Sequence, residues 1–166
     1  MDSSDRLPKH LLIGFLIALG VYAIFFTGDQ WLRVRKGAWA VSFQTNALGE
    51  AEILIGQPKL GIADVRVTFS GERATNAGAA LFDAPKKSIP FGVIKFEDLT
   101  YLPGSVAFDF FGHEVELLPR TLYLNKQEHG WTPRTNFVLQ PAQKLRPEMS
   151  FDPRQKRRRS LDRNKP

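Results

Sequence analysis

The sequence predicts a mainly β protein: an antiparallel β-sandwich, with a jelly roll as the candidate subtype, between one N-terminal transmembrane helix and a disordered basic C-terminal tail. Three observations lead to this prediction: an uncharged apolar run near the N-terminus, short stretches of alternating apolar and polar residues, and a C-terminal segment that holds the charge surplus. With 166 residues, the chain has room for one domain of ordinary size. Its 43% hydrophobic and 24% charged residues are typical of a globular chain and not of a disordered one.

The apolar run covers residues 11–27 and follows a short N-terminal tail, residues 1–10. As a helix it is about 26 Å long, close to the ~30 Å hydrocarbon core of a bilayer, with Tyr22 and Trp31 placed for the interface. No small-x-small cleavage pattern follows the run, and the run lacks the polar face of a buried helix. We therefore expect a retained anchor, with residues 11–34 forming the transmembrane helix and its juxtamembrane extension.

The flanking charges do not decide the orientation of this helix in the membrane, because three positive groups lie on each side. The positive groups are the terminal amine, Arg6 and Lys9 before the run, and Arg33, Arg35 and Lys36 after it. A short tail, an anchor and then a folded domain is the plan of a bacterial signal anchor, so we expect a single-pass protein of the inner (cytoplasmic) membrane with an extracytoplasmic, periplasmic domain. Gly14 and Ala18 form a small-xxx-small pair, which adds the expectation of a homodimer contact within the membrane.

Residues 37–141 change to the period of two that is typical of strands. In WAVSF, Trp39, Val41 and Phe43 face one way, and the same alternation recurs at residues 64–70, 106–110, 115–117, 122–124 and 137–139. Gly, Pro and Asn interrupt these segments at short spacing, and no convincing helical period follows Lys36. Short alternating strands with such turns predict an antiparallel sandwich of roughly seven to nine strands.

The segment FDFFGHEVE, residues 108–116, raises the question of whether it is a site or a turn, because it holds three acids and a histidine. Gly112 and His113 fit the two-residue loop of a type II′ hairpin, whose first position needs a positive φ. This register places His113 at a solvated loop tip. It also places four apolar side chains on one face, namely Phe108, Phe110, Val115 and Leu117. We therefore interpret the segment as a hairpin.

The opposite face of this hairpin carries Asp109, Glu114 and Glu116, a cluster of like charges that requires neutralisation. Lys95 or Arg120 from an adjacent strand is the expected counter-ion. The alternative is a hard cation such as Ca²⁺, which prefers oxygen ligands. In that case millimolar calcium would raise the melting temperature of the domain, and an unchanged melting temperature would refute the metal site.

The sequence gives little support to catalysis. The chain has no cysteine, which excludes disulfides, thiolate zinc sites and cysteine nucleophiles. No serine lies in a G-x-S-x-G elbow, and neither a Walker loop nor a dinucleotide fingerprint occurs. We therefore expect no enzymatic activity and no cofactor. A hydrolase with an unrecognised carboxylate site is kept as an alternative, because carboxylates distant in the sequence can converge.

Two aromatic residues are candidates for ligand stacking. Trp131 follows a predicted loop, and Tyr123 alternates in phase with Thr121 and Asn125. Exposed aromatic rings combine a large apolar face with a polar group that can orient a ligand. An extracytoplasmic carbohydrate- or lipid-binding domain is therefore a second functional hypothesis, with Tyr123 and Trp131 as the stacking platform.

Residues 142–166 form the basic tail, with nine basic and three acidic residues, whereas the preceding 141 residues hold 14 of each sign. The tail has almost no apolar periodicity, so we expect it to be disordered by itself. Its densest cluster comprises Lys156, Arg157, Arg158, Arg159 and Arg163. Such a cluster can bind an anionic polymer, an anionic lipid or an acidic protein surface. Specific nucleic-acid recognition is not expected, because no aromatic residues are interleaved with the charges.

Together these features favour a membrane-anchored, non-catalytic β-sandwich that acts as a scaffold or interaction module of a cell-envelope assembly. The chain would contact the lipid bilayer through residues 11–27 and would have protein partners. The separate basic tail would add an electrostatic contact to that assembly.

Overall fold

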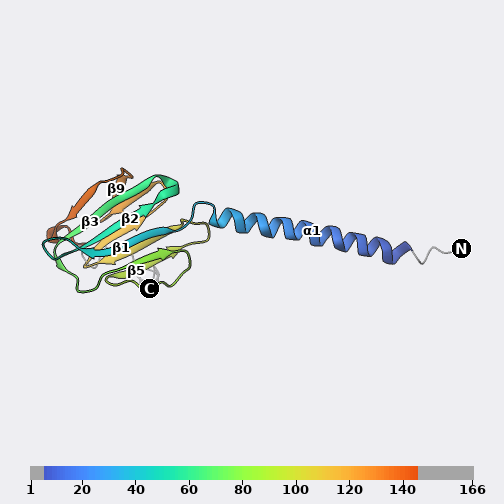
Figure 1. Cartoon of the computed structure of the whole chain (residues 1–166), viewed down its shortest axis with the longest axis horizontal. Helices are drawn as coiled ribbons and strands as arrows, with labels where there is room; N and C mark the ends of the chain where they lie inside the picture. The colour runs from blue at the N-terminus through green and yellow to red at the C-terminus, as the bar shows by residue number, and fades with distance from the viewer. Residues whose placement is uncertain (1–5, 146–166) are drawn as a thin grey trace, which may run out of the picture.

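The computed structural model describes residues 6–145, which form one long helix followed by two packed β-sheets (Figure 1). Helix α1 (Arg6–Val34) projects away from the sheets, and its large apolar side chains are exposed along its length. The segment Pro8–Val34 is long and apolar enough to cross a membrane, a test that a signal sequence also passes. The predicted single N-terminal apolar helix is therefore confirmed. The basic cluster of the predicted tail lies outside the described residues.

Helix α1 ends where a glycine takes a backbone conformation that other residues rarely adopt. Gly37 has φ of 73°, and its N–H donates to the carbonyl of Val34 over 3.1 Å. A glycine in the left-handed region just after a helix satisfies carbonyls of the last turn without a Cβ penalty. The chain then enters the first strand at Trp39, so only four residues separate the helix from the sandwich.

Ten strands form two sheets of five strands each. The first sheet has the order β10-β3-β2-β1-β4, with strands β1 (Trp39–Thr45), β2 (Glu50–Gln57), β3 (Ile62–Arg73), β4 (Gly78–Phe82) and β10 (Asn136–Leu139). The second has the order β5-β6-β7-β8-β9, with strands β5 (Val93–Asp98), β6 (Ser105–Phe110), β7 (His113–Leu117), β8 (Thr121–Leu124) and β9 (Gln127–Gly130). Two short 3₁₀ turns, η1 (Pro58–Leu60) and η2 (Pro141–Gln143), complete the described elements.

The predicted mainly β sandwich is confirmed, and its two sheets differ in strand order. The second sheet is a meander, in which each strand pairs antiparallel with the strand that follows it in the sequence. In the first sheet β1, β2 and β3 are neighbours in this way, but β4 returns to pair with β1, which gives the order of a Greek key; only β10 pairs parallel, with β3. A jelly roll, which we gave as the candidate subtype, contains two Greek keys, and the meander of the second sheet is not one of them. The short turns after β6, β7 and β8 return each strand to its immediate neighbour, which is why this meander forms.

The core lies between the inner faces of the two sheets and is rich in phenylalanine. Trp39, Val41 and Phe43 are buried, as their alternation predicted. Phe108 and Phe110 from the second sheet are fully buried against them, and the ring of Phe110 lies 6.1 Å from that of Phe43 in an edge-on arrangement. Edge-to-face aromatic contacts add about 0.5–1.5 kcal/mol per pair to the burial itself. The core therefore binds the two sheets into one unit.

The hairpin of FDFFGHEVE exists, but its turn lies one residue earlier than predicted. Phe110 pairs with His113, and the loop consists of Phe111 and Gly112, which have positive φ values of 55° and 88°. Two positive φ values define a type I′ turn, not the predicted type II′ turn. Both turns place Phe108 on the core face, so the alternation could not distinguish them. The prediction of a solvated His113 was wrong, because this side chain is fully buried.

The sandwich has one end next to α1 and a distal end. Turn η1 and the loops at residues 99–104 and 118–120 lie next to α1, and the indole of Trp39 donates to the carbonyl of Gly104 there. The turns at residues 111–112 and 125–126 lie at the distal end. Residues 140–145 join them there, since the N–H of Leu145 donates to the carbonyl of Gly112. The described chain therefore ends at the distal end of the sandwich, opposite α1 (Figure 1).

Candidate functional site

The carboxylates of the β6–β7 hairpin gather on the outer face of the second sheet. Asp109 lies directly opposite Glu114, and Glu116 follows two residues later on the same face of β7. Lys95 from β5 bridges them, with its Nζ 3.3 Å from Oδ2 of Asp109 and 3.5 Å from Oε2 of Glu114. Lys95 was one of the two predicted counter-ions, and this prediction is confirmed. The other, Arg120, is exposed in the turn between β7 and β8.

This cluster is closed to solvent to an unusual degree for the outer face of a sheet. The side chain of Glu114 is only 7% exposed. Burial raises the pKa of Glu116, and the hydrogen bond between its carboxyl group and that of Glu114 raises the pKa further. A raised pKa means that the Glu116 carboxyl group keeps its proton to a higher pH than usual. Lys95 offsets part of the negative charge of the three carboxyl groups and ties β5, β6 and β7 to one another.

The proposed calcium site is not tested by this arrangement. Within residues 6–145, no three His, Asp or Glu side chains converge as a metal-binding group. The ammonium of Lys95 already lies between Asp109 and Glu114, so a calcium ion would have to displace it. Calcium binding at Asp109, Glu114 and Glu116 stays a hypothesis, with the melting temperature in millimolar calcium as its test.

His113 is buried on the core face beside the ring of Phe69. The side-chain amide of Asn125 lies 3.0 Å from its Nδ1, while its Nε2 is buried without a partner among the described residues. Burial lowers the pKa of His113, and the positive charge of Lys144 lowers it further. The ring is therefore neutral near pH 7. Its surroundings are those of a structural histidine that connects the hairpin to the end of the described chain.

The two predicted stacking residues lie on opposite faces of the second sheet. Tyr123 is on the outer face, opposite Glu116, and its hydrogen bond with Glu128 raises its pKa. Trp131 packs inward, with its ring 5.3 Å from that of Trp39 and its indole N–H donating to a backbone carbonyl. The structure therefore does not bring the two rings together into one platform.

A groove of about 300 Å³ lies where the edges of the two sheets meet, between β9 and β10. The ring of His129 from β9 packs 5.0 Å from that of Phe137 in β10, and the remaining lining residues carry neutral amides or apolar side chains. The sequence did not indicate this groove, because its lining combines residues of β8 and β9 with residues of β10 and of the segment that follows β10. The groove depends on the parallel pairing of β10 with β3, and no local sequence pattern indicates that pairing.

The junction between α1 and the sandwich is a network of hydrogen bonds. The N–H of Leu102 donates to the carbonyl of Arg33 over 2.6 Å, and the Arg33 guanidinium donates to the carbonyl of Thr100 and lies over the ring of Tyr101. A salt bridge of 2.6 Å to Asp29 fixes the same guanidinium from the helix side. The last turn of α1 is therefore held by the loop that joins β5 to β6.

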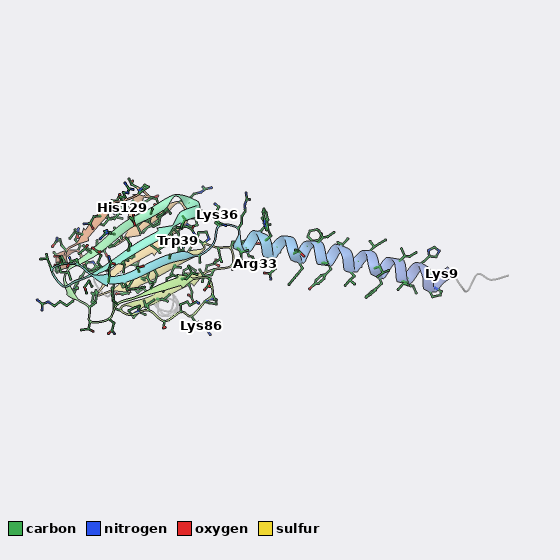
Figure 2. The ribbon with its side chains drawn as sticks, in the orientation of Figure 1. Lys9, Arg33, Lys36, Trp39, Lys86 and His129 are labelled. Carbon is green, nitrogen blue, oxygen red and sulfur yellow. The ribbon has the colours of Figure 1, made fainter. Side chains whose placement is uncertain are left out.

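The four residues after the helix are bonded as well. Lys59 in η1 donates to the carbonyl of Arg35 over 3.2 Å. The amide of Gln57, which is buried, donates to the carbonyls of Gly37 and Ala38 over 3.1 and 2.8 Å. A segment whose carbonyls are engaged in this way is not a free linker. Figure 2 shows Arg33 and Lys36 at this junction, with Trp39 just inside the sandwich.

Comparison of the chain with protein-family models, curated proteins and solved structures finds no match. The functional conclusion therefore rests on the residues and contacts described above.

Proposed function

We propose that this protein is a membrane-anchored, non-catalytic β-sandwich that acts as a scaffold or interaction module of a cell-envelope assembly. In this proposal α1 is a retained anchor in the inner membrane, and the sandwich lies on the extracytoplasmic side. The anchor fixes the height and the orientation at which the sandwich meets its protein partners.

The observation that carries this proposal is the bonded junction between α1 and the sandwich. Arg33, in the last turn of α1, is held by the loop at residues 99–104, and Gln57 and Lys59 hold the residues that follow. A flexible tether between the helix and the domain would lack such contacts. The contacts favour an anchor that transmits a fixed orientation.

Two further observations favour a non-catalytic role over the hydrolase alternative. Asp109 and Glu114 of the hairpin are paired with Lys95, and the side chain of Glu114 is only 7% exposed, which leaves little of this cluster open to a substrate. His113, the histidine nearest to them in the sequence, is buried in the core. A catalytic pair needs groups that a substrate can reach.

The anchor is tested by the mass and extraction behaviour of the full chain. Membranes from producing cells are washed with alkaline carbonate, and the retained protein is then analysed by intact-mass spectrometry. The proposal expects a chain that resists extraction and keeps residues 6–34. A mass that corresponds to cleavage near residue 27 would refute it. Ser160→Cys, the only cysteine in such a variant, reports the side of the membrane: labelling of intact cells by an impermeant maleimide supports the extracytoplasmic placement, and labelling only after lysis contradicts it.

The scaffold role is tested by lengthening the junction. Insertion of five Gly and Ser residues between Lys36 and Gly37 leaves the anchor and the sandwich intact but frees one from the other. The proposal expects the wild-type chain to migrate in a complex larger than a monomer on native gels of mildly solubilised membranes, and the insertion to weaken that complex. A wild-type chain that migrates as a monomer would contradict the scaffold role.

A further inference from the structure

The junction between α1 and the sandwich contains a pocket of about 310 Å³ that faces outward beside the helix. It is lined by Leu32, Arg35 and Lys36 from the end of α1, by Tyr101, Leu102 and Pro103 from the loop after β5, and by Pro119 from the loop after β7. Its walls are mostly apolar, and two cationic side chains stand at its helix side. No part of the sequence pattern indicated it, because its lining comes from three separate segments.

The pocket lies at the depth of lipid headgroups if α1 spans the membrane, and the inference rests on that part of the proposed function. Centred in a ~30 Å hydrocarbon core, the ~26 Å apolar run ends at Thr27 about 2 Å inside the edge of the core, and Leu32 follows five residues later, so it lies about 5–6 Å beyond that edge. The headgroup layer of a bilayer extends roughly 5–7 Å beyond the hydrocarbon core on each side. Two exposed aromatic residues beside the pocket, Trp31 and Tyr101, are of the kind that anchors proteins at this layer.

The charges at the pocket complement an anion. The Arg35 guanidinium lies over the ring of Trp31, 5.4 Å from its centre, which positions the charge without using its hydrogen-bond donors. Across residues 6–145, neither Arg35 nor Lys36 forms a salt bridge. Lys59 lies close by, since its ammonium donates to the Arg35 carbonyl. Arg33, in contrast, is already paired with Asp29.

We propose that this pocket binds the headgroup of an anionic phospholipid, with Arg35 and Lys36 on the phosphate and the glycerol region against Leu32, Leu102 and Pro103. Arginine matches phosphate oxygens with a fork of N–H donors, and lysine adds a point charge. A zwitterionic headgroup carries a cation of its own that these two residues repel, so the site selects lipids with net negative charge. One bound lipid would add a contact between the bilayer and the sandwich at the rim of the anchor.

The test measures lipid selectivity of the full chain in phosphatidylcholine vesicles. A trace of spin-labelled phosphatidylglycerol or spin-labelled phosphatidylcholine is added, and the immobilised fraction in the electron paramagnetic resonance spectrum gives the relative association of the two lipids. We expect phosphatidylglycerol to associate at least about fivefold more strongly, the effect of one basic residue near an anionic surface. The double variant Arg35→Gln/Lys36→Gln should lose most of this preference.

Two matched variants separate this pocket from other positive charge. Arg73→Gln/Lys126→Gln removes the same charge at the distal end and should keep the preference. A chain that ends at Leu145 lacks the basic tail and should also keep it. Folding is verified by urea unfolding followed by tryptophan fluorescence. The unfolding midpoint of the double variant should equal that of the wild-type chain.

The outcomes distinguish this inference from the proposed anchor. A chain that floats with the vesicles but whose preference survives Arg35→Gln/Lys36→Gln would overturn the lipid site alone. A preference that disappears only with the tail would assign the lipid contact to the tail and would overturn the site as well. A wild-type chain that does not float with vesicles would overturn the anchor and, with it, this inference.

Discussion

Replacing Lys95 by methionine tests whether the hairpin cluster is a closed charge network. Methionine keeps the apolar stem of the side chain and removes only the ammonium. The change leaves Glu114, whose side chain is 7% exposed, without the cation that lies 3.5 Å away, and it leaves Asp109 without one at 3.3 Å. The carboxyl groups of the outer face then repel one another with no counter-ion between them.

The size of the effect follows from the burial of the partners. At an effective dielectric constant near 20, each of these contacts has a gross Coulomb energy of about 5 kcal/mol, most of which the desolvation of the ions offsets. Removing one partner of a fully buried pair costs about 3–5 kcal/mol. Because Lys95 is 25% and Asp109 is 34% exposed, solvent screening reduces this cost. We expect Lys95→Met to lower the free energy of unfolding by about 2 kcal/mol.

The assay is urea unfolding of the full chain in detergent micelles at pH 7, with the fluorescence of the buried Trp39 as the main reporter. Lys87→Met is the matched control, because it makes the same change at an exposed salt bridge with Asp83 and should have little effect. The difference between wild type and Lys95→Met should vanish near pH 3, about where carboxyl groups are protonated. An equal effect of the two substitutions, or a difference that persists near pH 3, would refute the charge network.

Four further substitutions test the positions of neighbouring side chains. Glu116→Gln should raise the urea midpoint at pH 7 and raise it much less at pH 4. The pKa of Glu116 is raised in the folded state, so this carboxyl group favours folding at a pH below its unfolded pKa, and the contribution is lost as the pH rises through the folded pKa. His113 has a lowered pKa, so folding should weaken as the pH falls below its ordinary 6.5, and His113→Gln should remove most of that dependence. Trp131→Phe should cost about 1–2 kcal/mol through its lost hydrogen bond and packing, whereas Tyr123→Phe should leave the core intact.

Each of these predictions has a result that contradicts it. A lower midpoint for Glu116→Gln at pH 7 would show that the ionised carboxylate stabilises the fold. A stability of the wild-type chain that does not change between pH 7 and pH 5 would contradict a buried, neutral His113. Equal stability losses from Trp131→Phe and Tyr123→Phe would contradict their placement on opposite faces of the sheet.

The faces of the hairpin could be predicted from the sequence, but its turn could not. The alternation of apolar and polar residues assigns Phe108 and Phe110 to the core face. It does so equally for two pairing registers that differ by two residues, so it cannot choose between them. The choice between Gly112-His113 and Phe111-Gly112 depends on whether His113 gains more from burial beside Phe69 than from solvent. Nothing within the segment contains that information, since Phe69 lies in β3 and Asn125 in the turn after β8.

Strand β2 was missed for a different reason. Its sequence EAEILIGQ shows no clear period of two, because Leu54 lies between Ile53 and Ile55 in an apolar run. The structure also buries Glu52 on the outer face of the first sheet, where polar residues were expected to be exposed. Its carboxylate accepts hydrogen bonds from Gln44 over 2.6 Å and from Thr68 over 3.0 Å. A buried charge that is satisfied by two neighbouring strands is a property of the assembled sheet and has no local pattern.

The apolar helix α1 was predictable from composition, but its bonded junction with the sandwich was not. In the sequence, the positive residues after the apolar run contributed only a count of flanking charge. In the structure the carbonyl of Arg33 accepts from the N–H of Leu102, which is 69 positions away in the chain. Only the tertiary structure brings such residues together. For the same reason the sequence did not indicate the pocket beside α1.

The fixed junction is the central claim, and an electron–electron distance measurement tests it most directly. The chain has no cysteine, so Gln30→Cys on α1 and Leu48→Cys in the exposed turn after β1 provide two unique spin-label sites. In lipid nanodiscs the account predicts one narrow distance distribution, which the five-residue insertion between Lys36 and Gly37 should broaden. A wild-type distribution as broad as that of the insertion variant would contradict the account.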